Sequence, residues 1–174
     1  MDNSNVRARY DKFSRLLHWV CAVGIIYASI VGYALHFITD KKIFAFFSEL
    51  NMSLATVVTV LMVMRFVWRF FRPSVPYGSH ITGAKKGAIV FMHELFYLII
   101  FVVLISGFIM LEHGYRLFGL VNIPQPVRNE AVNHFFFMIH RGGCIALSVM
   151  LLLHVAAVAK HHWVDKNPIL SRMR

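Results

Sequence analysis

Charged residues are scarce in this chain of 174 residues, and they are nearly absent from four long stretches. The first stretch has no Asp, Glu, Lys or Arg and the other three have one each; they span residues 16–39, 43–64, 87–111 and 131–159. A water-soluble domain would show helices or strands with one polar face, so the pattern excludes an ordinary soluble fold. A bilayer core about 30 Å thick needs about 20 apolar residues of helix. The stretches therefore predict four membrane-spanning helices, in which every backbone group bonds within its own segment.

The predicted fold is all-α: a membrane-embedded four-helix bundle that forms one domain over residues 1–174. The helices are expected at about residues 13–38, 43–71, 84–111 and 131–163. The first span is too long for a signal peptide and lacks a small-residue cleavage site, so we expect it to be retained. The longest connection, from Glu112 to Glu130, contains Pro124 and Pro126 and is expected to hold a short interfacial helix.

Cysteine and acidic residues are also few. The two cysteines, Cys21 and Cys144, both fall inside expected helices, where an isolated cysteine usually acts as a small apolar side chain. We therefore expect no disulfide between them. Eight acidic residues against eighteen basic ones give a formal charge of +10, an excess that is also found in proteins that bind nucleic acid.

The positions of the basic residues explain that excess differently. Thirteen of them lie before the first expected helix, around the second connection and in the tail: Arg7, Arg9, Lys12, Arg15, Arg65, Arg69, Arg72, Lys85, Lys86, Lys160, Lys166, Arg172 and Arg174. The first and third connections carry four: Lys41, Lys42, Arg116 and Arg128. Lys and Arg gather on the cytoplasmic side of membrane proteins, so both termini are predicted to be cytoplasmic. No nucleic-acid partner is expected.

Histidine is the informative polar residue within the apolar stretches. His140 and His154 are fourteen residues apart, which places them on one side of a helix and about 21 Å apart along its axis. Ionisable residues inside a membrane are costly and usually mark a functional site. The alternative on spacing alone is two unrelated imidazoles that each bond to a neighbouring helix.

A third histidine favours a shared site. His18 lies near the cytoplasmic end of the first helix and His154 near the cytoplasmic end of the fourth, so the two have a similar depth. Two neutral imidazoles at equal depth suit the axial positions of a haem iron. A structural zinc site is a poor alternative, since it needs four ligands and no thiolate or carboxylate is expected nearby.

Several of these features together resemble the bacterial cytochrome b561 family over nearly the whole chain. The features are His18-Trp19, the pair His140 and His154, Arg65 and Arg69 late in the second helix, and the tail KHHWVDKNPILSRM. The resemblance implies a four-helix membrane bundle that holds two b-type haems and exchanges electrons with quinone. One branch of the family oxidises superoxide and passes the electron to ubiquinone. Other relatives are membrane cytochrome subunits of hydrogenases and formate dehydrogenases.

By this resemblance, His18 and His154 hold the cytoplasmic haem b, and His140 holds a second haem with a histidine early in the second helix. The matching position in this chain is Asn51, and the second helix contains no histidine. An amide oxygen is a feeble iron ligand. Four outcomes stay open: ligation by Met52, ligation by His36, a five-coordinate haem on His140 alone, or no second haem.

Further roles are implied by the resemblance or by position. His161 matches a position associated with the quinone site, and an imidazole there could donate a proton to a quinone oxygen; the alternative is an interfacial pair with His162. Arg141 is placed to neutralise a haem propionate. If superoxide is the periplasmic donor, only Lys41, Lys42, Arg116 and Arg128 would attract it, and their effect should be modest.

The sequence therefore predicts a membrane oxidoreductase of the cytochrome b561 kind in a bacterial inner membrane, with lipid and ubiquinone as partners. Two other hypotheses remain. The chain could be the haem-bearing anchor of a hydrogenase- or dehydrogenase-type complex, with a soluble redox partner subunit. It could also be a haem-free four-helix membrane protein.

Overall fold

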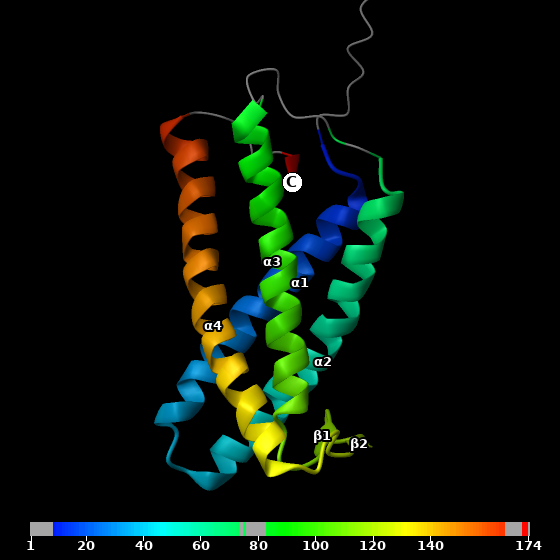
Figure 1. The fold of residues 1–174 in the computed structure, drawn as a ribbon, viewed down its shortest axis with the longest axis vertical. Helices are drawn as coiled ribbons and strands as arrows, with labels where there is room; N and C mark the ends of the chain where they lie inside the picture. Colours follow the sequence, from blue (N-terminus) through cyan, green and yellow to red (C-terminus); the bar gives the residue numbers. More distant parts are fainter. Residues whose placement is uncertain (1–8, 74, 76–82, 166–171, 174) are drawn as a thin grey trace, which may run out of the picture.

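The computed structural model describes residues 9–73, 75, 83–165 and 172–173. Four long helices form the molecule: α1 (Lys12–Ala34), α2 (Lys41–Phe71), α3 (Gly83–Ile109) and α4 (Glu130–Ala159). A 3-10 turn (Leu35–Phe37) follows α1, and a π-helical turn (Lys160–Val164) follows α4. All four helical segments are long and apolar enough to cross a membrane, which confirms the all-α membrane bundle (Figure 1).

Three of the helices begin at a side chain that accepts hydrogen bonds from the first turn. Asp11 accepts from the backbone N–H of Ser14, Asp40 from those of Lys42 and Ile43, and Asn129 from that of Val132. Asp and Asn are preferred at this position because they satisfy N–H groups that have no partner within the helix. These caps fix where the chain leaves each connection and enters the membrane.

The bundle consists of two closely packed pairs, α1 with α2 and α3 with α4. A methyl group added at Gly24 of α1 would lie 2.5 Å from Cγ2 of Val58 in α2, and one at Gly143 of α4 would lie 2.9 Å from Cγ2 of Val103 in α3. Small residues allow membrane helices to approach this closely. The contact between α2 and α3 is slighter, and α1 and α4 approach each other less still in the described part of the chain.

Side chains from all four helices meet in the middle of the bundle. The buried cluster there consists of Cys21, Val58, Met62, Ile100 and Leu147. The outer surface is apolar as well, with exposed side chains such as Val23, Ile30, Val60 and Leu152. An apolar surface of this extent matches the bilayer core as its surroundings.

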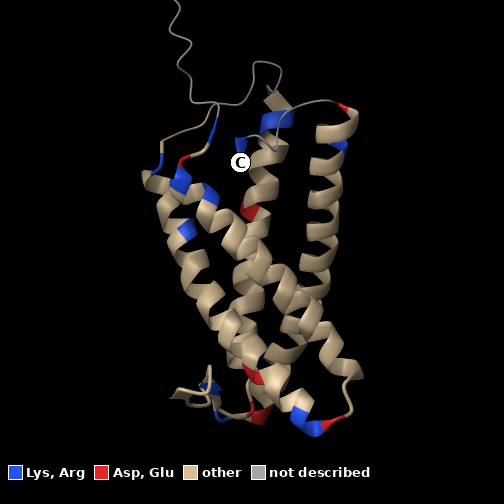
Figure 2. Cartoon of the chain, turned by 180° about the vertical axis from the view of Figure 1, so that it is seen from behind, with Lys and Arg blue, Asp and Glu red and all other residues tan. Residues whose placement is uncertain are grey.

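Both ends of the described chain lie at the same end of the bundle, which we call the cytoplasmic end. The backbone N–H of Tyr10 donates to the carbonyl of Arg172 (3.1 Å), and the indole N–H of Trp19 donates to that of Met173 (2.9 Å). Residues 166–171 of the tail that carries part of the family resemblance lie outside the described residues. Lys and Arg gather at this end in Figure 2, in agreement with the charge bias of the sequence.

The opposite, periplasmic end carries a β-hairpin of β1 (Tyr115–Leu117) and β2 (Val121–Ile123), paired antiparallel. The prediction of a short interfacial helix in this connection is wrong. Two consecutive turn residues, Phe118 and Gly119, have positive φ angles of 49° and 73°, a conformation that reverses the chain and cannot continue a right-handed helix. Ser53 of α2 accepts a hydrogen bond from the N–H of Phe118 (2.9 Å), which holds the turn against the bundle.

Candidate haem site

His18 lies in the second turn of α1, at the cytoplasmic end of the bundle. The side chain is half-buried, and its Nδ1 is buried without a hydrogen-bond partner among the described residues. The ring stands edge-on to that of Trp19, with centroids 5.4 Å apart. A buried ring nitrogen without a partner is costly unless another group binds there.

His154 occupies the cytoplasmic half of α4 and is also half-buried. Its ring packs edge-on against Phe96 of α3, with centroids 5.4 Å apart. His18 lies within electrostatic range of His154, Arg65 and His93, which come from the three other helices. The structure therefore brings the two sequence-predicted imidazoles into one region.

The chemistry of this donor set fits a haem better than a bare metal ion. No group of three or more His, Cys, Asp or Glu side chains that could hold a metal comes together in residues 9–73, 75, 83–165 and 172–173. Two imidazoles suffice for a haem, because the macrocycle supplies the other four ligands. The weak approach between α1 and α4 leaves these two histidines on helices that are not closely packed against each other.

Arg65 of α2 is the cation beside the two histidines, within electrostatic range of both His18 and His154. Its Nε donates to the hydroxyl of Tyr97 (3.3 Å). Arg141, which the sequence indicated for a propionate, is exposed and thirteen residues from His154, about 20 Å along α4. The sequence pointed to Arg65 only as one feature of the family resemblance and gave it no role at the haem.

A second arginine of α2 is already paired. Arg69 forms a two-pronged ion pair with Glu94 of α3, with NH1 2.8 Å from Oε2. The guanidinium also lies 5.3 Å from the ring centres of Phe66 and Tyr97. This pair joins α2 to α3 at the cytoplasmic end, where those helices otherwise make few contacts.

His140 lies in the periplasmic half of α4, and its ring is wedged between α4 and α3. Nδ1 is 2.9 Å from the carbonyl oxygen of Val103, and Nε2 is 3.4 Å from Sγ of Cys144. The structure thus does not group His140 with His18 and His154.

The three residues considered as partners of His140 have different surroundings. Asn51 is half-buried, and its Oδ1 is buried without a hydrogen-bond partner in the described chain. Met52 is half-buried. His36 is exposed in the turn after α1, with Nδ1 3.2 Å from the carbonyl oxygen of Gly32.

His161 lies on the π-helical turn at the cytoplasmic exit of α4. Its Nδ1 is 2.6 Å from Oδ2 of Asp165, and 45% of its side-chain surface is exposed. A carboxylate only accepts, so Nδ1 carries the hydrogen and Nε2 is left for another partner. The neighbouring His162 stands edge-on to Trp163, and its Nδ1 is buried without a partner among the described residues. Turns of this π type are frequent at functional sites.

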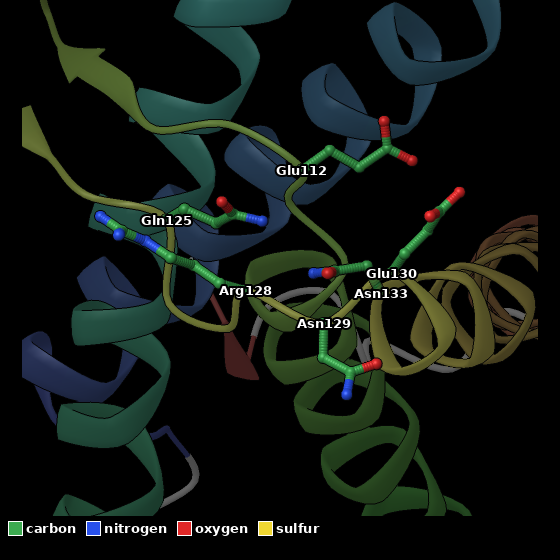
Figure 3. A pocket seen from close by; sticks show the side chains of 6 residues that line it. All are labelled: Glu112, Gln125, Arg128, Asn129, Glu130 and Asn133. Carbon is green, nitrogen blue, oxygen red and sulfur yellow. The ribbon is translucent and has the colours of Figure 1, made fainter.

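The periplasmic end carries charges of both signs (Figure 2). The four basic residues that the sequence indicated there are matched by four acidic ones: Asp40, Glu49, Glu112 and Glu130. Arg128 lines a pocket of about 360 Å³ together with Glu112 and Glu130. In Figure 3 its guanidinium extends toward Gln125, whereas both carboxylates extend to the opposite side. The net charge of this end is therefore close to zero.

Comparison with known proteins identifies the family to which this sequence belongs. The sequence model described as prokaryotic cytochrome b561 matches residues 9–174. A protein of Escherichia coli (strain K12) described as cytochrome b561 homolog 2 is 25% identical over 185 residues, which cover 99% of this chain and 95% of that protein. The resemblance inferred from the histidines, arginines and tail is confirmed.

Proposed function

Because the chain belongs to the prokaryotic cytochrome b561 family, we propose that His18 and His154 would hold a haem b in the cytoplasmic half of the bundle. The chain is a multi-pass protein of the bacterial inner membrane that transfers electrons by haem b. One observation carries the ligand assignment. Half-buried imidazoles from two loosely approaching helices lie in one region, and Nδ1 of His18 has no partner among the described residues.

The protein side chains would hold the cofactor and set its surroundings. Bound haem b supplies one-electron chemistry, because its iron accepts and releases a single electron. Arg65 would neutralise a propionate, since its guanidinium lies within electrostatic range of both histidines. On the periplasmic side of the ligands, the cluster that includes Cys21 and Met62 excludes water from the bundle.

The electron acceptor or donor at the cytoplasmic interface is a quinone, with ubiquinone as the one implied by the resemblance. Reduction of a quinone to quinol takes two electrons and two protons, and the protons have to come from protein groups or water at the interface. In its doubly protonated form, His161 would pass the Nε2 proton to a quinone oxygen and keep the Nδ1–H that Asp165 holds, and the neutral ring would then regain a proton from cytoplasmic water. Asp165 holds the Nδ1–H side of the ring, so that Nε2 faces the substrate.

Superoxide is the periplasmic donor implied by one branch of the family. The periplasmic end attracts an anion only weakly at long range, because its four basic residues are balanced by four acidic ones. If superoxide donates the electron at this end, the rate of its oxidation should be nearly independent of ionic strength.

The ligand assignment is tested with the purified chain by pyridine haemochrome assay and reduced-minus-oxidised spectra. His18→Ala and His154→Ala should each abolish the low-spin b-type spectrum. His36→Ala is the matched control, because this histidine is exposed and bonded only to its own helix. Retention of a normal spectrum in either ligand variant would contradict the assignment.

The quinone assignment is tested by mixing the reduced protein with a ubiquinone analogue and following haem oxidation. His161→Ala should slow the reaction at saturating quinone by about 10²-fold or more, the usual contribution of one general acid. His162→Ala is the adjacent control. Equal effects of the two substitutions would remove His161 from the quinone site. The same assay, started with superoxide in place of a chemical reductant, shows whether superoxide is a donor.

A further inference from the structure

The surroundings of His140 conflict with a second haem. Its Nδ1 donates to the carbonyl oxygen of Val103 in α3, at 2.9 Å. That bond alone suits a metal ligand too, because ligating histidines commonly donate their other N–H to a carbonyl. The second ring nitrogen distinguishes the two roles. Nε2 is 3.4 Å from Sγ of Cys144, one turn along the same helix, and a thiol is a weak donor to a ring nitrogen.

A glycine of α3 makes the space for this ring. A methyl group added at Gly107 would lie 2.8 Å from Cε1, 3.0 Å from Nδ1 and 3.7 Å from Nε2 of His140. The edge of the ring that carries both nitrogens therefore rests on the α3 backbone. A haem plane needs open space on the iron side of Nε2, and here α3 and Cys144 border that nitrogen.

At the α2 position that the family resemblance assigns to the second ligand, this chain has a poor iron ligand, Asn51. Asn51 lies on the same face of α2 as Val58 and Met62, which are core residues, so it faces the interior. Its buried Oδ1, which has no partner among the described residues, is a neutral carbonyl oxygen. Such oxygens suit harder ions, whereas iron in haem takes imidazole, thiolate or thioether ligands. This oxygen suits a water molecule or an N–H donor better than iron.

The β-hairpin occupies the neighbouring surface of α2. Tyr115 of β1 is 7% exposed, and its hydroxyl bonds to Oγ1 of Thr56. Ser53, fully buried, donates to the carbonyl of Glu49 and accepts from the N–H of Phe118. The hairpin thus covers the side of α2 that carries Ser53 and Thr56, next to the position where the second ligand would be needed.

We propose that this chain holds a single haem b, and that His140 is not an iron ligand but a clamp that ties α4 to α3. The proposal rests on the proposed function for the cytoplasmic haem and removes the second, periplasmic one that the family resemblance implies. His140 belongs to the same part of the α3–α4 contact as Gly143 and Val103, where small residues allow the two helices to pack closely.

A single cytoplasmic haem changes the electron path. Between the periplasmic surface and the level of His18 and His154 lie the hairpin contacts and the apolar cluster with Cys21, Val58 and Leu147. No second redox centre would bridge that distance. Electron exchange would therefore be confined to the cytoplasmic half of the bundle, where His161 and Asp165 also lie, and a periplasmic donor such as superoxide would not be used.

The test counts haem per chain in the full-length protein, purified in detergent after expression with excess haem precursor. We expect one haem per chain in the wild type by pyridine haemochrome against amino-acid analysis. His140→Ala should keep that ratio and the Soret position. Asn51→Leu, which leaves the clamp intact, should also keep both. His18→Ala should lose the haem.

The outcomes separate this proposal from the proposed function. Two haems per chain in the wild type, with one lost in His140→Ala, would overturn the single-haem proposal and leave His18 and His154 as ligands of the other haem. A high-spin signal that shifts with carbon monoxide and disappears in His140→Ala would overturn it equally. No haem in the wild type would overturn both. The wild-type count decides even if His140→Ala does not fold.

Discussion

The fit of the His140 ring against Gly107 gives a quantitative prediction. Gly107→Ala would place a methyl group 2.8 Å from Cε1 of His140, whereas carbon atoms prefer separations of about 3.5–4.0 Å. The ring must therefore move by roughly 0.7 Å or more. A shift of that size along the bond to Val103 would lengthen it from 2.9 Å to roughly 3.6 Å, beyond hydrogen-bonding distance.

The change in the free energy of unfolding caused by Gly107→Ala is the sum of two opposing contributions. Overpacking a well-filled site costs about 1–3 kcal/mol, and replacing a helical glycine by alanine gains about 0.5–1 kcal/mol. Gly107→Ala should therefore lower the free energy of unfolding by about 1 kcal/mol in the wild type. In a His140→Ala background the methyl group meets no ring, and the same substitution should raise it by about 0.5–1 kcal/mol. The coupling between the two positions is then about 1–3 kcal/mol.

The measurement is a double-mutant cycle on denaturant unfolding in detergent micelles, followed by circular dichroism. Gly32→Ala is the control, because a methyl group there has no neighbour within 4 Å and should act alike in both backgrounds. If Gly107→Ala has the same effect with and without His140, the ring does not fill this space and the clamp is refuted.

Three further predictions concern the cytoplasmic end. Partial burial raises the pKa of Asp11, but hydrogen bonds from Ser14 and Trp68 outweigh burial and lower the pKa overall. The ionised carboxylate therefore stabilises the fold above about pH 4, and this stabilisation is lost as the pH falls through the lowered pKa of the folded protein. The difference in melting temperature between wild type and Asp11→Asn should vanish in acid. Glu94→Gln should destabilise by about 1 kcal/mol through loss of the Arg69 pair, measured by unfolding at low and high salt, and no salt dependence would contradict this. Arg65→Gln should lower the haem midpoint potential by on the order of 50 mV in a redox titration, since a nearby positive charge favours the reduced form; an unchanged potential would place Arg65 away from the haem.

Much of the site could be predicted from the sequence because membrane helices obey local rules. The length of an apolar run is set by bilayer thickness, and the Lys and Arg bias sets orientation, so neither depends on which helices touch. The proposed pairing of His18 with His154 follows from their equal depth and from the family resemblance. The presence of Asn51 at the position where the resemblance implies a histidine is likewise a property of the sequence alone.

Tertiary structure decided which neighbour each inward side chain meets. Helical periodicity gave His140 and His154 one face, yet one lies against α3 at Gly107 and the other in the region of His18. That difference depends on the separate close approaches of α1 to α2 and of α3 to α4, which involve residues far apart in the chain. The hairpin arose from backbone angles at Phe118 and Gly119 that composition did not reveal. A local pattern fixes the direction of a side chain on its own helix, whereas its partner depends on how the helices pack.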